Sequence, residues 1–493
     1  MRTEIKIEHQ EKDFMNRINV WNTYDLEMQK KCDEFAASYM DFLNSGKTER
    51  ECIDQIVRIA EENGYRELNE LITSGEKLKE GDRVYCIWMN KSAVLFRIGK
   101  LPMSSGLNIL GAHIDSPRLD VKQNPLYEDG GFAYLDTHYY GGIKKYHYVA
   151  QPLAIHGVVV KKDGETVEFS VGEDEDDPVF FVSDILIHLS QEQMKKTAAE
   201  VVTGENLDLT IASSPVRITA DSKAGSRDKK ASEADDVKKA VLQLLLEQYG
   251  IEEEDFESAE LEIVPAGKAR EAGFDRSMIL AYGQDDRVCA YPSLMAMVDA
   301  EAPERTTCCL LVDKEEIGSV GATGMQSHFF ENALAEVMNL TGGYSELELR
   351  RALSNSCMLS SDVSAAYDPL YASCFEKKNA AFMGEGMVFN KFTGARGKSG
   401  SNDSNAEYIA HLRKLYSEAD IRTQTAELGK VDVGGGGTIA YILALYGMNV
   451  IDSGVAVLNM HAPYEAASKA DIYEAYRAYR VFLEKADFCN IKV

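Results

Sequence analysis

Short apolar runs recur along the whole chain and alternate with stretches of helical character. The runs lie at Tyr85–Trp88, Ala93–Ile98, Leu107–Ala112, Thr307–Val312, Cys357–Leu359, Val450–Ile451 and Gly454–Leu458. The helical stretches lie at Tyr24–Asn63, Val288–Val298 and Ile472–Phe482. Short apolar runs bounded by glycine and polar residues are typical of buried strands, and their alternation with helices is typical of a doubly wound sheet. The sequence therefore predicts an α/β protein with helices on both faces of its sheet.

The segment from residue 124 to residue 264 differs from the rest of the chain. Its first half is rich in tyrosine, valine and turn glycines, as expected of antiparallel strands. In its second half the polar stretch Ala220–Ala231 is expected to be a loop, and Ser232 and Asp235 to cap a helix that runs to Gly250. We therefore expect an α/β domain of residues 1–123 and 265–493, interrupted by a β-rich domain of residues 124–264.

Composition excludes several classes of protein. The formal net charge of −27 over 493 residues opposes binding to nucleic acid or to an anionic membrane. There is no apolar stretch of about 18 residues, and the N-terminus lacks the apolar core of a secretory signal. The nine cysteines are odd in number and contain no CxxC pair, which argues against a disulfide framework and a zinc knuckle. These features predict a soluble protein of the cytoplasm.

Polar residues of metal-binding type stand near the ends of several predicted strands. They are His113 with Asp115, Asp285 with Asp286, Glu315 with Glu316, Asp362, and His461. Open α/β sheets bind ligands at the carboxyl ends of their strands, and imidazole and carboxylate groups suit Zn²⁺ or Mn²⁺. Two ions about 3.5–4 Å apart need a shared ligand, and a short aspartate at a strand-to-helix junction, such as Asp285, can supply it.

The adjacent glutamates Glu315 and Glu316 need separate roles. Neighbouring side chains of an extended segment point in opposite directions, so both cannot easily coordinate one ion. One is expected to bind metal, while the other takes a proton from an activated water and delivers it to a leaving amine. Hydrolysis of an amide is the reaction that this arrangement predicts.

Each cluster taken alone has an ordinary structural explanation. His113 with Asp115 could be a surface or capping pair, Glu315 with Glu316 a solvated pair, and Asp285 with Asp286 a helix N-cap. Asp362 could belong to a turn after a strand, and His461 could be a core histidine. Only the joint arrangement of the clusters favours a two-metal site.

Five motifs together resemble the aspartyl aminopeptidase family of two-metal (zinc) aminopeptidases. They are GAHIDSPRLD (111–120), GQDDR (283–287), DKEEIGS (313–319), SSDVSAAYDP (360–369) and NMHAPYE (459–465). Their order and spacing match the family, and the similarity runs from about Phe35 to the C-terminus. The resemblance implies a metal-dependent aminopeptidase that removes the N-terminal residue of peptides through a metal-activated water.

The resemblance also implies a role for each candidate residue. Asp285 would bridge two divalent ions, most simply Zn²⁺, with Co²⁺ or Mn²⁺ as alternatives. His113 and Asp362 would complete one ion, and Glu316 and His461 the other. Glu315 would be the general base, and Asp115 would orient His113 without touching metal.

The family architecture is a zinc-exopeptidase-like catalytic domain interrupted by a dimerisation domain, with dimers assembled into a shell of twelve subunits. By this resemblance residues 1–123 and 265–493 form the catalytic domain and residues 124–264 the dimerisation domain. His188, in the stretch ILIHL, would assist the active site of a neighbouring subunit; the alternative is a buried structural histidine. Gly436, in the glycine run 434–437, would lie beside the substrate backbone.

One departure from the family concerns specificity. Members that prefer N-terminal Asp or Glu carry a lysine after a Gly-x-Val-x segment, whereas here Gly386–Phe389 is followed by Asn390. Lys391 comes one position later, and the strand period of two would direct it to the opposite face. This departure argues against the family's preference for acidic N-terminal residues. The stretch KFTGARGKSG (391–400) could still supply a cation through Lys391, Arg396 or Lys398, so an acidic preference stays open and Lys391 is kept as a candidate substrate residue. The competing hypotheses are a two-metal deacylase or carboxypeptidase, and a catalytically silent self-assembling shell protein.

Overall fold

A nine-stranded mixed sheet forms the centre of the larger part of the molecule. The computed structural model describes residues 18–215, 236–301 and 303–488. From edge to edge the strands are β1 (Arg66–Glu67), β2 (Arg83–Trp88), β3 (Ser92–Arg97), β13 (Thr307–Val312), β4 (Asn108–His113), β14 (Cys357–Ser361), β18 (Asn449–Gly454), β16 (Met387–Asn390) and β17 (Thr423–Ala426). The four central strands β13, β4, β14 and β18 are mutually parallel. Their carboxyl ends therefore meet at one edge of the sheet.

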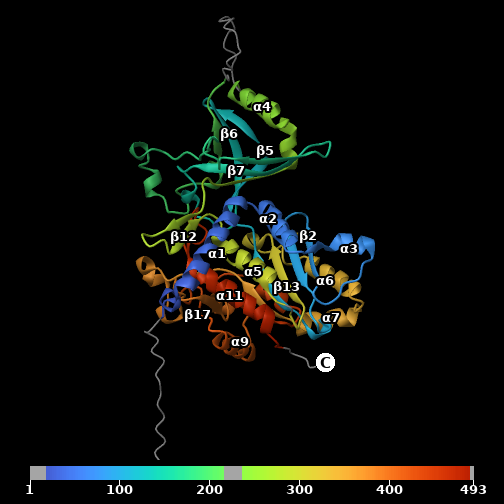
Figure 1. Cartoon of the computed structure of the whole chain (residues 1–493). Coiled ribbons are helices and arrows are strands. Elements are labelled where there is room, and N and C mark those ends of the chain that lie inside the picture. The colour runs from blue at the N-terminus through green and yellow to red at the C-terminus, as the bar shows by residue number, and fades with distance from the viewer. Residues whose placement is uncertain (1–17, 216–235, 302, 489–493) are drawn as a thin grey trace, which may run out of the picture.

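Helices cover both faces of this sheet (Figure 1). One layer contains α1 (Leu26–Ser45), α2 (Glu49–Glu62), α5 (Gln284–Asp299), α9 (Ala406–Glu418) and α11 (Lys469–Lys485). The other contains α3 (Leu68–Ser74), α6 (Phe329–Leu340), α7 (Glu346–Asn355) and α10 (Ala440–Ala444). Successive strand residues alternate between the two cores, for example Ile109 and Leu110 of β4. The predicted α/β fold with helices on both faces is confirmed.

The charged helical stretch Tyr24–Asn63 is divided into two helices. The chain leaves α1 at Gly46, and Thr48 then caps α2 through a reciprocal capping box with Glu51. Each partner satisfies a backbone N–H that the helix start would otherwise leave free.

No helix among the described residues is both long enough and apolar enough to span a bilayer. None of the eight cysteines in the same ranges forms a disulfide, and only Cys374 is exposed.

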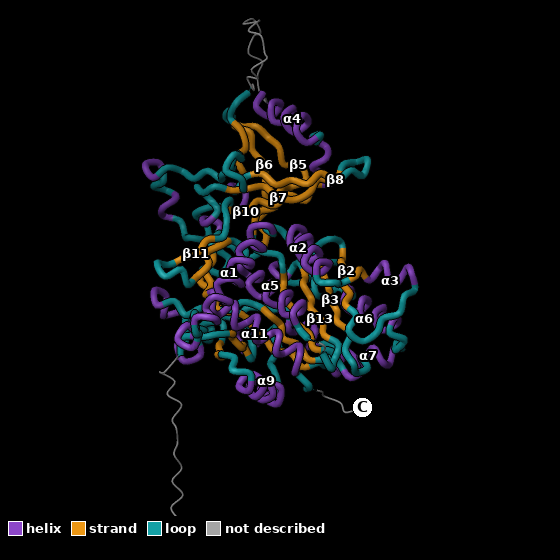
Figure 2. The backbone as a smooth tube through the Cα atoms, viewed as in Figure 1, coloured by secondary structure: helices purple, strands orange, loops and turns teal. Residues whose placement is uncertain are grey.

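A separate six-stranded antiparallel sheet stands apart from the large one (Figures 1 and 2). Its order is β8 (Thr166–Val171), β7 (Leu153–Val160), β10 (Ala259–Pro265), β5 (Arg118–Asp129), β6 (Phe132–Tyr140) and β9 (Leu209–Ala212). Helix α4 (Asp236–Tyr249) packs against it through residues such as Val241 and Leu245. The expected helix before Gly250 is thus present, whereas the loop Ala220–Ala231 and the caps Ser232 and Asp235 lie outside the described residues.

The limits of the two domains remain a prediction. Strand β5 begins at Arg118, so the expected boundary between residues 123 and 124 falls inside a strand of the second sheet.

A third, five-stranded sheet lies beside the large one. It joins β11 (Arg270–Ala272), β12 (Met278–Ala281), β20 (Glu465–Ser468), β19 (Ala456–Leu458) and β15 (Ser364–Ala365).

A buried histidine connects the second sheet to helix α2. His156 of β7 has its Nδ1 2.7 Å from Glu51 Oε1 and its Nε2 3.3 Å from Glu173 Oε1, while Lys47 Nζ lies 3.5 Å from the same Glu173 oxygen. Burial disfavours the charged ring, but the hydrogen bonds to Glu173 and Glu51 outweigh it and raise the pKa of His156 to about 9. The protonated imidazole therefore stabilises this junction.

The free energy of unfolding is expected to fall as the pH rises from about 6.5 to about 9. A histidine whose pKa is raised on folding stabilises fully below its unfolded value near 6.5 and loses that contribution as the folded group deprotonates. The change should be about 3 kcal/mol. Urea denaturation at several pH values measures it, and His156→Gln should flatten this part of the profile. An unchanged slope in the variant would show that another group is responsible.

Candidate metal centre

The candidate site forms where the central strands of the large sheet end. His113 is the last residue of β4, Glu315 and Glu316 follow β13, and Asp362 follows β14. Because β13, β4 and β14 are parallel neighbours, these side chains meet at one edge.

Two further segments complete the site. Asp285 stands at the start of α5, where Asp285 and Asp286 have non-helical backbone angles, and His461 lies in the turn between β19 and β20. Asp285, Glu315, Glu316, Asp362 and His461 all line one cavity of about 830 Å³.

The two oxygens of the Asp285 carboxylate face two different imidazoles. Asp285 Oδ1 lies 3.2 Å from His113 Nε2, and Asp285 Oδ2 lies 3.2 Å from His461 Nε2. Glu316 Oε2 is 3.5 Å from His461 Nε2, and Glu315 Oε2 is 3.9 Å from His113 Nε2. One carboxylate with a separate imidazole at each oxygen is the arrangement that a ligand shared by two ions requires.

The ligand atoms also group closely enough to hold metal. Three sets have one ligand atom from each member within 4.8 Å of the others: His113, Glu315 and Asp362; His113, Asp285 and Glu316; and Asp285, Asp286 and Asp362. Glu316 Oε1 is buried and has no hydrogen-bond partner among the described residues. A buried carboxylate oxygen without a donor is costly unless a cation satisfies it, so the donor set fits divalent ions.

The electrostatics of the protein groups point the same way. Burial raises the pKa of Glu316 and of Asp362 well above the usual range, and the neighbouring carboxylates add to the effect. His113 is buried, yet hydrogen bonds to Asp115 and Asp285 raise the pKa of its ring well above 6.5. The protein alone would thus hold extra protons to offset crowded negative charge, a task that divalent cations perform directly.

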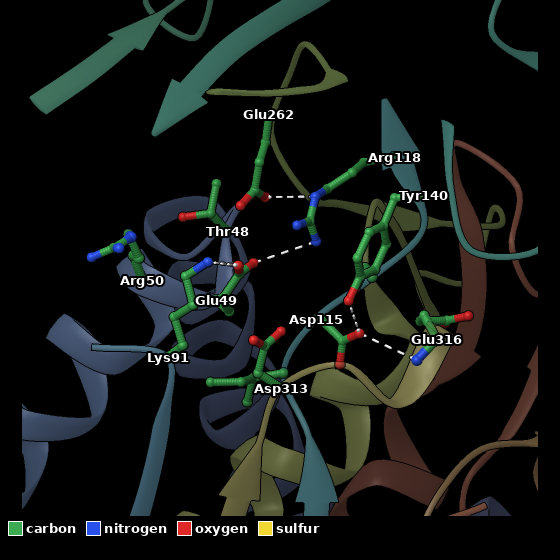
Figure 3. Close-up of polar contacts among 12 residues, drawn as sticks. Thr48, Glu49, Arg50, Lys91, Asp115, Arg118, Tyr140, Glu262, Asp313 and Glu316 are labelled. Carbon is green, nitrogen blue, oxygen red and sulfur yellow. Dashed lines mark hydrogen bonds and ion pairs between the residues drawn. The ribbon is translucent and has the colours of Figure 1, made fainter. Parts of the chain in front are cut away.

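Asp115 lies behind His113 rather than among the metal-facing groups. Its Oδ1 is 3.2 Å from His113 Nδ1, and it also accepts hydrogen bonds from the backbone N–H groups of Glu315 and Glu316, each at 3.2 Å. The Tyr140 hydroxyl donates to Asp115 Oδ2 at 2.8 Å (Figure 3). This side chain is therefore placed to fix the ring of His113 and the turn that carries both glutamates.

The sequence-based reasoning missed several residues that orient the site, and two of them contact His461. Glu465 is buried and accepts hydrogen bonds from Asp285 N at 2.9 Å and from His461 N at 2.7 Å. The carbonyl of Gly142 lies 2.8 Å from His461 Nδ1. Glu465 could have been found from the sequence, because it lies four residues after His461 in the last motif, NMHAPYE (459–465). Gly142 gave no signal, because it belongs to the segment assigned to the inserted domain.

The expected substrate residues have mixed positions. Gly436 lines the cavity, and its N–H donates to Thr393 O at 3.0 Å. Asn390 also lines the cavity, whereas Lys391 lies outside its lining and pairs with Asp403. His188 is exposed in the short helix η4 (Ile187–Leu189), so the alternative of a buried histidine is wrong for the single chain.

Comparisons with known proteins agree on one family. The family model described as aminopeptidase I zinc metalloprotease (M18) matches residues 42–483. A protein of Clostridium acetobutylicum described as a probable M18 family aminopeptidase 1 is 57% identical over 465 residues, covering 94% of this chain and 97% of the relative. Its counterpart from Thermotoga maritima is 44% identical over 472 residues, covering 96% and 99%.

Solved structures give the same result. The crystal structure of an M18-family aminopeptidase from Thermotoga maritima superposes with a TM-score of 0.88 at 44% identity, covering 96% of this chain and all of that one. The structure of aminopeptidase I from Clostridium acetobutylicum gives a TM-score of 0.86 at 55% identity, with 95% and 99% covered. The chain is thus similar to both over nearly its whole length.

Proposed function

The chain belongs to the aminopeptidase I (M18) family of zinc metalloproteases, and from this premise we propose that it removes the first residue of peptides at the site around Asp285. The observation that carries the proposal is the single buried carboxylate whose two oxygens face His113 and His461. Glu315, within 3.9 Å of His113, supplies the acid–base group that a purely structural metal site would not need. This favours an enzyme over a silent shell protein.

The residues divide between two metal positions in the proposal. His113 and Asp362 hold one ion, Glu316 and His461 hold the other, and Asp285 is shared. Zinc is the metal of the family, and cobalt or manganese would suit the same donors. When bound, the ions polarise the scissile carbonyl and lower the pKa of water.

Glu315 is the proposed general base. It lines the cavity, and burial raises the pKa of its carboxyl to about 7, with His113 acting in the opposite sense. A base whose pKa lies near neutrality can take the proton of the attacking water and then deliver it to the departing amine. Asp115 supports this step indirectly, because it fixes the backbone of Glu315.

We propose that the preferred N-terminal residue is neutral rather than acidic. The described residues that line the cavity include Asn390, Thr393, Leu428, Tyr441 and Met460, and no lysine or arginine is among them. An acidic side chain would enter a cavity already crowded with carboxylates and would find no countercharge. The nearby lysines Lys391 and Lys398 both pair with Asp403 instead.

A panel of aminoacyl substrates tests this proposal. Leu, Ala, Asp and Glu derivatives are compared with a free and with an acetylated α-amine, using the zinc-loaded protein. Free neutral substrates should turn over at least about tenfold faster than free acidic ones, which corresponds to about 1.4 kcal/mol in the transition state. Faster turnover of Asp and Glu would refute the specificity proposal alone. Hydrolysis of only the blocked substrates would indicate a deacylase or carboxypeptidase. The absence of any hydrolysis would indicate a shell protein.

We further propose that the protein assembles with itself, as dimers within a dodecamer. A yeast protein of the same fold, 18% identical with a TM-score of 0.71, is described as a dodecamer. In this chain the second domain exposes an apolar segment, with Leu186 55%, Ile187 68% and Leu189 68% accessible. Such a patch favours a protein interface, and it places the exposed His188 where a neighbouring subunit could receive it. Light scattering of the purified protein measures the number of chains.

A further inference from the structure

The end of strand β6 in the second sheet reaches into the metal centre of the large one. Tyr140 is the last residue of β6, is buried, and donates its hydroxyl proton to Asp115 Oδ2 at 2.8 Å. Two residues later the carbonyl of Gly142 lies 2.8 Å from His461 Nδ1. The corner Tyr140–Gly142 therefore contacts Asp115, which supports His113, and His461 itself.

Asp115 connects this corner to the catalytic groups. Its carboxylate is shared among the ring of His113, the hydroxyl of Tyr140 and the N–H groups of Glu315 and Glu316. The Tyr140 hydroxyl donates to the same Asp115 oxygen, Oδ2, as the N–H of Glu316. Without it, the carboxylate could rotate and carry the His113 ring and the glutamate turn with it.

The ring of Tyr140 is itself held in place. The guanidinium carbon of Arg118 lies 3.9 Å from the centroid of the ring, close enough for a cation–π interaction. Arg118 is buried and pairs with Glu49 of α2 at 3.4 Å and with Glu262 of β10 at 3.1 Å. Figure 3 shows this series of contacts from Glu262 and Glu49 through Arg118 and Tyr140 to Asp115. An ion-paired cluster between the second sheet and helix α2 therefore fixes the phenol.

We propose that Tyr140 is a positioning residue for the reaction, through which the second sheet sets the geometry of the metal site in its own subunit. The inference rests on the proposed function, because it assigns Tyr140 a task only if His113 binds metal and Glu315 moves protons. The second domain would then contribute to catalysis within one chain, independently of any role in assembly.

Tyr140→Phe removes the hydroxyl and retains the ring over Arg118. The matched control is Tyr148→Phe, because the Tyr148 hydroxyl is also buried in this region but donates to the backbone carbonyl of Pro117 at 2.9 Å. Three quantities are measured for wild type and both variants: the zinc dissociation constant by chelator competition, kcat and KM on a free neutral aminoacyl substrate, and the melting temperature of the zinc-free protein.

Tyr140→Phe should weaken zinc binding or lower kcat by about 10- to 100-fold, the usual effect of losing a partner that orients a metal ligand. KM and the zinc-free melting temperature should match those of Tyr148→Phe, which should keep wild-type zinc affinity and kcat. The inference is refuted if Tyr140→Phe keeps wild-type zinc affinity and kcat, or if both variants lose them equally. A wild-type protein that binds zinc without hydrolysing the substrate would instead refute the proposed function.

Discussion

Replacing Glu315 with glutamine is expected to lower kcat by at least about 100-fold while both metal ions remain bound. Glutamine preserves the size of the side chain and its place on the cavity wall, but it cannot accept the proton of the attacking water. The metal-facing atoms of Asp285, His461 and Glu316 are unchanged, so metal content and assembly should stay at wild-type levels. Steady-state kinetics and elemental analysis of the purified variant provide the measurements.

Glu304→Gln is the control for this substitution. Glu304 is an exposed glutamate that pairs with Lys100 far from the cavity, so its loss should leave kcat unchanged. If Glu315→Gln turned over substrate like wild type, another group would have to be the base. If it lost metal instead, Glu315 would be a ligand, as its grouping with His113 and Asp362 within 4.8 Å would allow.

Replacing Asp285 with alanine is expected to remove both metal ions and abolish measurable turnover. The two oxygens of this carboxylate face His113 and His461, so one substitution removes a ligand from each position. The substitution also removes one negative charge from the site, which lowers its attraction for cations and weakens binding further. Metal content after gel filtration, with zinc titration of the stripped protein, tests the expectation.

Asp299→Ala gives a matched control on the same helix. Asp299 is the last residue of α5 and accepts a hydrogen bond from Tyr476 at 2.7 Å, far from the cavity. This variant should retain two ions and wild-type turnover. Retention of both ions by Asp285→Ala would eliminate the shared-ligand assignment, and loss of a single ion would show that Asp285 serves only one position.

The candidate site was largely predictable because its residues follow strands. His113 directly follows an apolar run, and Glu315 and Asp362 each come three positions after the end of one. Parallel strands bring their carboxyl ends to one edge whatever the sequence separation. Lys391, the candidate substrate residue, does not line the cavity, whereas Asn390 does; the two side chains differ as the strand period of two indicates. Periodicity and strand order were therefore enough to predict the position of a side chain that its own strand places.

The residues that support the site were harder to predict, because their positions depend on how separate elements pack. Tyr140 ends strand β6 of the second sheet and Gly142 follows it, and no local pattern reveals that this corner touches Asp115 and His461. Strand β5 likewise begins at Arg118, before the sequence becomes rich in tyrosine, valine and glycine, because its first residues pair with β10 and β6. The break before α2 was readable, since Thr48 and Glu51 have capping-box spacing.

Anomalous diffraction from crystals of the zinc-loaded protein, recorded at the zinc absorption edge, tests the central claim most directly. We predict two peaks per chain, about 3.5–4 Å apart, with the Asp285 carboxylate between them and Glu315 bound to neither. A single peak, a pair of peaks away from His113 and His461, or coordination of zinc by Glu315 would contradict the account.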